Sequence, residues 1–228
     1  MAYLDSLKAH DEDPSLPQTT IDPLTGKYQY FANTDWFKEL YKDNVPAIEQ
    51  SISVSGGSEK VNFLISGRYY HQDGIFRYNT DKFNRYNLRF KGSIKANDWL
   101  TIHTNTDYSS YKYTYPLTSV GGLNAVWRML AVTGFPVSPL LNPDGTMTIV
   151  GAYSVGDFYY GKSKSTTTQN FLRNTVGFNA AAIKDKLSVK GDFSYLFTNT
   201  EEERKFFTVP YSIKPGEMIP VLDRKSVV

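Results

Sequence analysis

The sequence contains no cysteine, which excludes disulfides, cysteine-based zinc sites and thiol nucleophiles. It also has no run of about 18 apolar residues, so a transmembrane helix is excluded. An excess of one charge is absent too, since 25 Lys and Arg face 23 Asp and Glu. No bulk electrostatic attraction to nucleic acid follows from such a balance.

Aromatic residues, in contrast, are abundant. They make up 15% of the chain and include 17 Tyr, yet the mean hydropathy is only −0.41. Such a composition suits half-solvated strands with alternating side chains. A membrane-crossing strand needs only about 9–11 residues that are apolar at alternate positions, so the missing apolar runs leave a β-barrel open.

Apolar residues recur with a period of two along six segments. Each segment has one apolar face and one polar face. In the third segment the polar face carries Arg85, Arg89 and Lys91, which is too much charge for a protein core and indicates a water-filled space. The predicted strands cover residues 48–55, 61–72, 85–95, 99–113, 168–182 and 188–197.

The connections alternate in length. Tight turns are predicted at residues 56–59, 96–98 and 184–186, whereas 73–82, 114–167 and the segment from 198 onward are long. All tight turns therefore lie at one edge of the sheet, as in outer-membrane barrels. The predicted fold is all-β, a partial antiparallel transmembrane β-barrel of about six strands, with long outer loops and a short helix. A soluble antiparallel sandwich is the alternative.

The organisation follows from these boundaries. Residues 1–46 are expected to form an outer-loop segment with a short helix at 34–41. Residues 47–200 hold the barrel strands together with the long outer loop 114–167, which has a second helical candidate at 123–132. Residues 201–222 begin a further outer loop.

The two ends predict an incomplete fragment. Residues after Met1 lack the basic start and apolar core of a signal peptide, so Met1 is expected to be an internal methionine. The tail 223–228 equals the translation of a common sequencing adapter, which predicts an artefact there.

Four stretches resemble the SusC/RagA-type TonB-dependent transporters of Bacteroidetes outer membranes. They are 33–41 (NTDWFKELY), 51–60 (SISVSGGSEK), 69–75 (YYHQDGI) and 85–89 (RYNLR). The motifs NDWL at 97–100 and NPDG at 142–145 fit as well. The resemblance extends over about residues 33–200.

The resemblance implies energised uptake of an oligosaccharide or peptide across the bacterial outer membrane. It implies as partners the membrane lipid, a SusD-type surface lipoprotein as lid, and the TonB complex through an N-terminal plug. The sequence departs from the family because it has no plug or TonB-contacting segment, and six strands instead of about 22. Six strands cannot close a wide barrel, so we expect this chain to form part of a wall.

Catalytic chemistry has little support. The three histidines, His10, His71 and His103, form no HExxH-like ligand set, and no carboxylate pair or phosphate-binding loop stands out. We therefore expect no enzyme activity, no cofactor and no metal site. A soluble carbohydrate-binding or adhesin-like β-domain is the alternative function.

Substrate contact is expected in the long outer loop. Its aromatic side chains could stack on sugar faces, or could equally pack the loop against its neighbours. The candidates for substrate contact are Trp127, Tyr153 and Tyr159.

Overall fold

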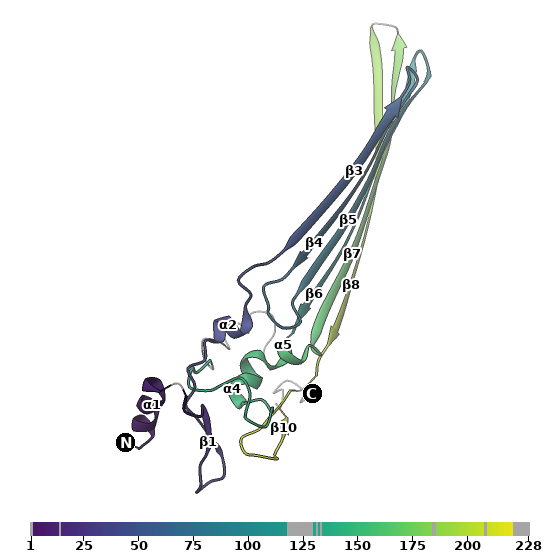
Figure 1. Ribbon diagram of the computed structural model, residues 1–228. Helices are drawn as coiled ribbons and strands as arrows, with labels where there is room; N and C mark the ends of the chain where they lie inside the picture. Colours follow the sequence, from purple (N-terminus) through teal and green to yellow (C-terminus); the bar gives the residue numbers. More distant parts are fainter. Residues whose placement is uncertain are drawn as a thin grey trace.

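A six-stranded antiparallel sheet dominates the computed structural model, and each of its strands pairs with its neighbours in sequence (Figure 1). The structure describes residues 2–13, 15–117, 130, 132, 134–183, 186–207 and 209–220. The sheet comprises, in spatial order, β3 (Ala47–Gly57), β4 (Val61–Asp73), β5 (Lys82–Asn97), β6 (Leu100–Pro116), β7 (Lys164–Ile183) and β8 (Leu187–Lys205).

The register aligns the apolar residues of neighbouring strands with one another. Val61 lies opposite Ile94, which lies opposite Ile102, which in turn lies opposite Phe178. Since side chains alternate between faces along a strand, this alignment builds one continuous apolar face. We call it the apolar face, and the opposite one, with Arg85 and Arg89, the polar face. The predicted alternation is thereby confirmed.

The sheet is open, with β3 and β8 as its edges, so the antiparallel arrangement is confirmed but barrel closure is not. All six strands are longer than predicted, and the largest extension is in β8. β7 begins at Lys164 and β8 continues to Lys205, into the segment predicted as loop. Thr, Ser and Glu face one another there, as in Thr166 opposite Glu203. The backbone ladder continues through such polar pairs, although they give no apolar alternation.

The remaining described segments gather at one end of the sheet and form a cap (Figure 1). Two small clusters of buried side chains hold it together. Trp36, Leu40, Leu130, Val155 and Phe158 form the first cluster, and Met147, Ala152 and Val209 form the second. The cap elements are helix α1 (Ala2–Glu12), the hairpin β1 (Thr19–Ile21) and β2 (Tyr28–Tyr30), helix α2 (Trp36–Leu40), the helical run α4 (Ile149–Gly151), η1 (Ala152–Gly156) and α5 (Asp157–Tyr160), and the pair β9 (Pro210–Tyr211) and β10 (Ile219–Pro220).

Only α2 matches a helix predicted from the sequence. Asp35 caps it by accepting hydrogen bonds from the backbone N–H groups of Phe37 and Lys38. Neither α1 nor the run 149–160 was expected, and the candidate at 123–132 lies largely outside the described residues. The run 149–160 contains glycines and aromatics with low helix propensity, so its burial in the cap stabilises it. None of the described helices is both long and apolar enough to span a membrane.

Asn79 is one of several side chains that join the cap to the loop between β4 and β5. Asn79, in the loop between β4 and β5, has a positive φ of 46°. Its amide donates hydrogen bonds to the carbonyl oxygens of Phe158, at 2.8 Å, and Tyr159, at 3.3 Å. It thereby satisfies carbonyls at the end of α5, which a helix leaves without a partner.

Candidate functional site: the polar face of the sheet

The residues predicted to contact substrate lie in or near the cap. Trp127 is outside the described residues. Tyr153 and Tyr159 are half-buried, and Tyr159 packs against both cap clusters. Its ring lies 5.1 Å from that of Tyr78, and the ring of Tyr153 lies 6.3 Å from that of Tyr211. These contacts fit the packing role that the sequence left open, and substrate contact by either ring stays a prediction.

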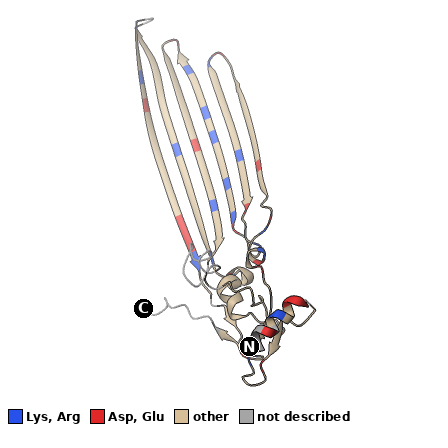
Figure 2. Ribbon diagram, turned by 90° about the vertical axis from the view of Figure 1, so that its left-hand side faces the viewer, with Lys and Arg blue, Asp and Glu red and all other residues tan. Residues whose placement is uncertain are grey.

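The polar face of the sheet contains a groove of about 770 Å³. Strands β3 to β7 all contribute to it, so its shape depends on the register of the whole sheet. Figure 2 shows the sheet with basic residues at intervals along its strands. We call this feature the Arg groove, and its lining includes Ser66, Arg68, Arg85, Arg89, Asp107 and Tyr111.

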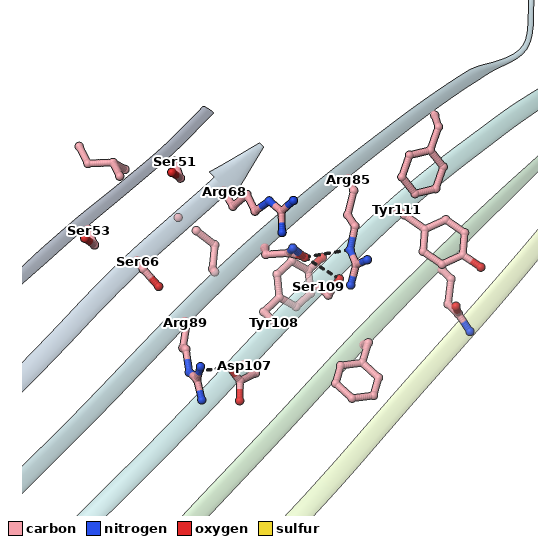
Figure 3. A pocket seen from close by; sticks show the side chains of 17 residues that line it. Ser51, Ser53, Ser66, Arg68, Arg85, Arg89, Asp107, Tyr108, Ser109 and Tyr111 are labelled. Atoms are coloured by element: carbon pink, nitrogen blue, oxygen red, sulfur yellow. Dashed lines mark hydrogen bonds and ion pairs between the residues drawn. The ribbon is translucent and has the colours of Figure 1, made fainter. Parts of the chain in front are cut away.

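The three arginines of the groove differ in their partners. Arg68 forms an ion pair with Glu49 of β3 at 2.7 Å, and Arg89 forms one with Asp107 of β6 at 3.0 Å. Arg85 has no ion pair among the described residues, and its Nε donates to the amide oxygen of Asn87 at 3.1 Å. The groove therefore carries an uncompensated positive charge at Arg85, between Arg68 and Tyr111 in Figure 3.

Aromatic rings line the polar face where the sheet approaches the cap. Phe83 is the centre of this group, with ring centroids of Tyr70, Tyr111 and Tyr113 at 6.0, 5.7 and 6.3 Å. Tyr113 continues the row to Tyr115 at 5.2 Å. The row starts on β4 and crosses to β6, so it presents ring surfaces next to the guanidinium groups.

A side-chain contact between His103 and Asp192 spans three strands near the tight turns. His103 of β6 and Asp192 of β8 meet at 2.7 Å across the intervening strand β7. Gly177 of β7 lies opposite both residues, and a Cβ there would overlap both side chains. Among the described residues no group of three or more His, Asp and Glu side chains is placed to hold a metal ion.

The opposite, apolar face consists of large hydrophobic side chains that are exposed in the isolated chain. Ile52 and Phe193 are 72% and 73% exposed. Others on this face are Ile48, Val54, Val61, Ile65, Leu88, Phe90, Ile94, Ile102, Val176, Phe178, Val189 and Phe197. A surface of this size and continuity requires an apolar surrounding.

Sequence reasoning located the charged residues of the polar face but missed its aromatic row. Phe83, Tyr111 and Tyr113 have odd numbers, as do Arg85 and Arg89 on β5 and Asp107 on β6. Extending the alternation to both strand ends would have placed these rings beside the arginines.

No family model matches the chain. A TonB-dependent receptor P26 from Formosa agariphila is 25% identical over 193 residues, which cover 80% of this chain and 17% of that protein. Solved structures of the RagAB peptide transporter, and of the RagAB peptide importer in its open-open state, share 20% identity. Their TM-scores are 0.61 and 0.60, and the match covers 88% and 92% of this chain.

The chain spans only a small part of these relatives, 22% of the matched chain in the RagAB transporter structure and 17% of the Formosa receptor. The similar proteins are named as a receptor, a peptide transporter and a peptide importer. The resemblance to the SusC/RagA type found in the sequence motifs is confirmed by these comparisons.

Proposed function

We propose that this chain, a SusC/RagA-type TonB-dependent outer-membrane transporter sequence, forms six adjacent strands of the barrel wall and has no catalytic role. The observation that carries the proposal is the division of the sheet into two faces. An apolar face such as that around Ile65 is stable against hydrocarbon, and a face with Arg85 and Arg89 is stable against a wet lumen.

The turn lengths give the wall a direction. Tight connections follow β3, β5 and β7, whereas long ones follow β4 and β6. In outer-membrane barrels the short turns lie on the periplasmic side. The cap then lies outside the cell. Trp99, which is 55% exposed at a tight turn, lies at the periplasmic interface of the outer membrane, where amphipathic rings are favoured.

The partners follow from the same orientation. The cap faces the side on which a SusD-type lipoprotein would act as lid, and the TonB complex would act through a plug inside the barrel. The transported nutrient is an oligosaccharide or a peptide, and a cap tyrosine such as Tyr153 or Tyr159 would meet it first. The similar RagAB structures are described as a peptide transporter and a peptide importer, which supports the peptide alternative, whereas the oligosaccharide alternative rests on the family resemblance.

Site-directed spin labels in the transporter containing this chain, reconstituted in bilayers, test the proposal. Labels at Val61, Phe63 and Ile65 should be relaxed by a lipid-soluble quencher. Matched labels at Asn62 and Ser66 on the same strand should respond to a water-soluble one. A strand that reports water at both sets, in a monodisperse detergent-free protein, would contradict the wall and favour the soluble carbohydrate-binding or adhesin-like domain.

A further inference from the structure

The Arg groove is built to hold negative charge. Among the residues that the structure describes, the neutral oxygen of Asn87 is the one hydrogen-bond partner of the Arg85 side chain, which is exposed. Arg68 lies one strand away, and its ion pair with Glu49 is itself half-exposed, at 51% and 48%. Since a guanidinium forms paired hydrogen bonds with carboxylate or sulfate oxygens, an anionic group entering here would find planar donors already in place.

Neutral hydrogen-bonding groups surround the arginines. The hydroxyls of Ser51, Ser53 and Ser66 border the groove on one side (Figure 3). Gln169 of β7 also lines it and adds a side-chain amide. The ring of Tyr111 lies opposite Arg85 in the register, 5.7 Å from that of Phe83. Ring faces beside hydroxyl and amide groups match the apolar faces and hydroxyl edges of a sugar.

An extended peptide has less to bind here. Peptides commonly bind a sheet by adding a strand to its edge. The arginines, however, lie on β4 and β5, whose neighbours occupy both sides, so the backbone groups are already paired. Recognition in the groove depends on side chains alone, and this favours a ligand that is rich in hydroxyl groups.

From this geometry we propose that the Arg groove binds acidic sugar units, so that the transporter selects anionic oligosaccharides that carry carboxylate or sulfate groups. Arg85 is the principal anion contact, Arg68 a second contact, and Tyr111 and Phe83 form the stacking surface. The inference rests on the proposed function, because the polar face must line the lumen for a nutrient to reach it.

Two probes with the same backbone measure the contribution of charge. Binding of an oligogalacturonate and of its fully methyl-esterified form is measured by calorimetry on the reconstituted transporter that contains this chain. Lipid exposure of Val61, Phe63 and Ile65 is recorded on the same sample. A wall that fails to insert is thereby distinguished from a correctly inserted wall without anion selectivity.

Three variants then locate the contact. Arg85→Gln should lower affinity for the acid about tenfold while leaving the ester unchanged. Lys190→Gln removes the same charge from the polar face of β8, outside the Arg groove, and should have little effect. Glu49→Gln releases Arg68 from its ion pair and should raise affinity for the acid about twofold to fivefold, a gain that misfolding cannot produce.

Three results would overturn the inference. The first is equal affinity for the acid and the ester in the inserted wild-type protein. The second is an equal loss of affinity for the acid in Arg85→Gln and Lys190→Gln. Such a result would show that only the overall positive potential of the polar face attracts the ligand. The third is a protein that does not bind the acidic sugar but binds an acidic peptide, with an affinity that falls in Arg85→Gln.

Discussion

The sheet and the cap bury their hydrophobic residues in opposite ways. In the cap, Leu40, Val155 and Phe158 are fully buried against one another. In the sheet, large side chains such as Phe193 stay exposed, and Tyr115, at the end of β6 near the cap, is the only buried hydrophobic residue among the described positions of the six strands. The cap therefore carries its own core, whereas the sheet is a single layer whose apolar side has no partner among the described residues.

The difference shows what each part requires from its surroundings. Cap stability comes from packing within the chain, in which side chains fill space and leave few voids. The sheet draws stability from backbone ladders and needs a surrounding solvent that is apolar on one side and aqueous on the other. Matched substitutions in the two parts can test this contrast.

The largest effect is expected at the centre of the cap. Phe158→Ala removes a fully buried ring and leaves a cavity, which should lower the free energy of unfolding of the cap by about 3–5 kcal/mol. The matched change Phe193→Ala, on the apolar face, should cost only the transfer contribution of about 1.5–3 kcal/mol, because lipid chains fill the space.

Hydrogen exchange of the bilayer-reconstituted protein measures both variants. Faster exchange in α5 and α2 with unchanged exchange in β4 and β5 is expected for Phe158→Ala. A Phe193→Ala variant as damaging as Phe158→Ala would show that another protein element, and not lipid, packs on the apolar face.

The second effect concerns charge on the two faces of one strand. Ile65→Lys places an ammonium on the apolar face and should destabilise the inserted protein by about 2–4 kcal/mol. Ser66→Lys, one residue on, places it on the polar face and should cost little. Urea unfolding from lipid vesicles measures the free energy of unfolding of the two variants. An equal decrease in both would contradict the assignment of one face to lipid and the other to water.

Much of the sheet was predictable because its physics is local and periodic. The alternation through Val61, Phe63 and Ile65 predicted a strand with one face in water and one face in an apolar environment. The short turns predicted that consecutive strands pair with one another. The motifs at 33–41, 51–60, 69–75 and 85–89 indicated the resemblance to SusC/RagA-type transporters. The extension of β8 to Lys205 was missed because polar cross-strand pairs stabilise strands without an apolar pattern.

The cap was largely unpredictable, since its order comes from contacts distant in sequence. The run 149–160 is helical because Val155 and Phe158 pack against Trp36 and Leu40 from more than 100 residues away. The Arg groove is an intermediate case. Its arginines follow from alternation, whereas the pairing of Arg68 with Glu49 and of Arg89 with Asp107 depends on the register between strands.

A smaller effect is expected where glycine permits a contact within the sheet. A Cβ at Gly177 would collide with His103 and Asp192, so Gly177→Ala should break this pair and destabilise the sheet by about 1 kcal/mol. Gly67→Ala is the matched control. Its nearest neighbour would be Leu88 at an ordinary 3.5 Å, and the added methyl should stabilise the strand by about 0.5–1 kcal/mol. Equilibrium unfolding should show that the two variants shift the free energy of unfolding in opposite directions. Shifts in the same direction would count against a stabilising contact between His103 and Asp192.

The smallest effect is a pH dependence confined to the cap. A hydrogen bond from the Thr146 hydroxyl is the main cause that lowers the pKa of Asp144, and the Tyr28 hydroxyl, which donates at 2.8 Å, adds to it. A lowered pKa means that this stabilisation is complete above the usual value of about 3.9 and is lost as pH falls through the lowered pKa. Burial, followed by the Asp144 contact, raises the pKa of Tyr28 to about 12. The stabilisation from this protonated hydroxyl is therefore complete below about pH 10 and is lost as pH rises through about 12.

Amide protection in β2, corrected for the intrinsic pH dependence of exchange, should therefore fall in acid while protection in β4 and β5 stays constant. Asp144→Asn should remove this acid step. The pKa of Asp22 is also lowered, first by the Thr25 hydroxyl and then by the backbone N–H of Leu24, within its own turn. Asp22→Asn should consequently leave the step at Asp144 intact. An acid step that persists in Asp144→Asn, or that appears equally in the sheet, would show that the cap does not respond independently of the wall.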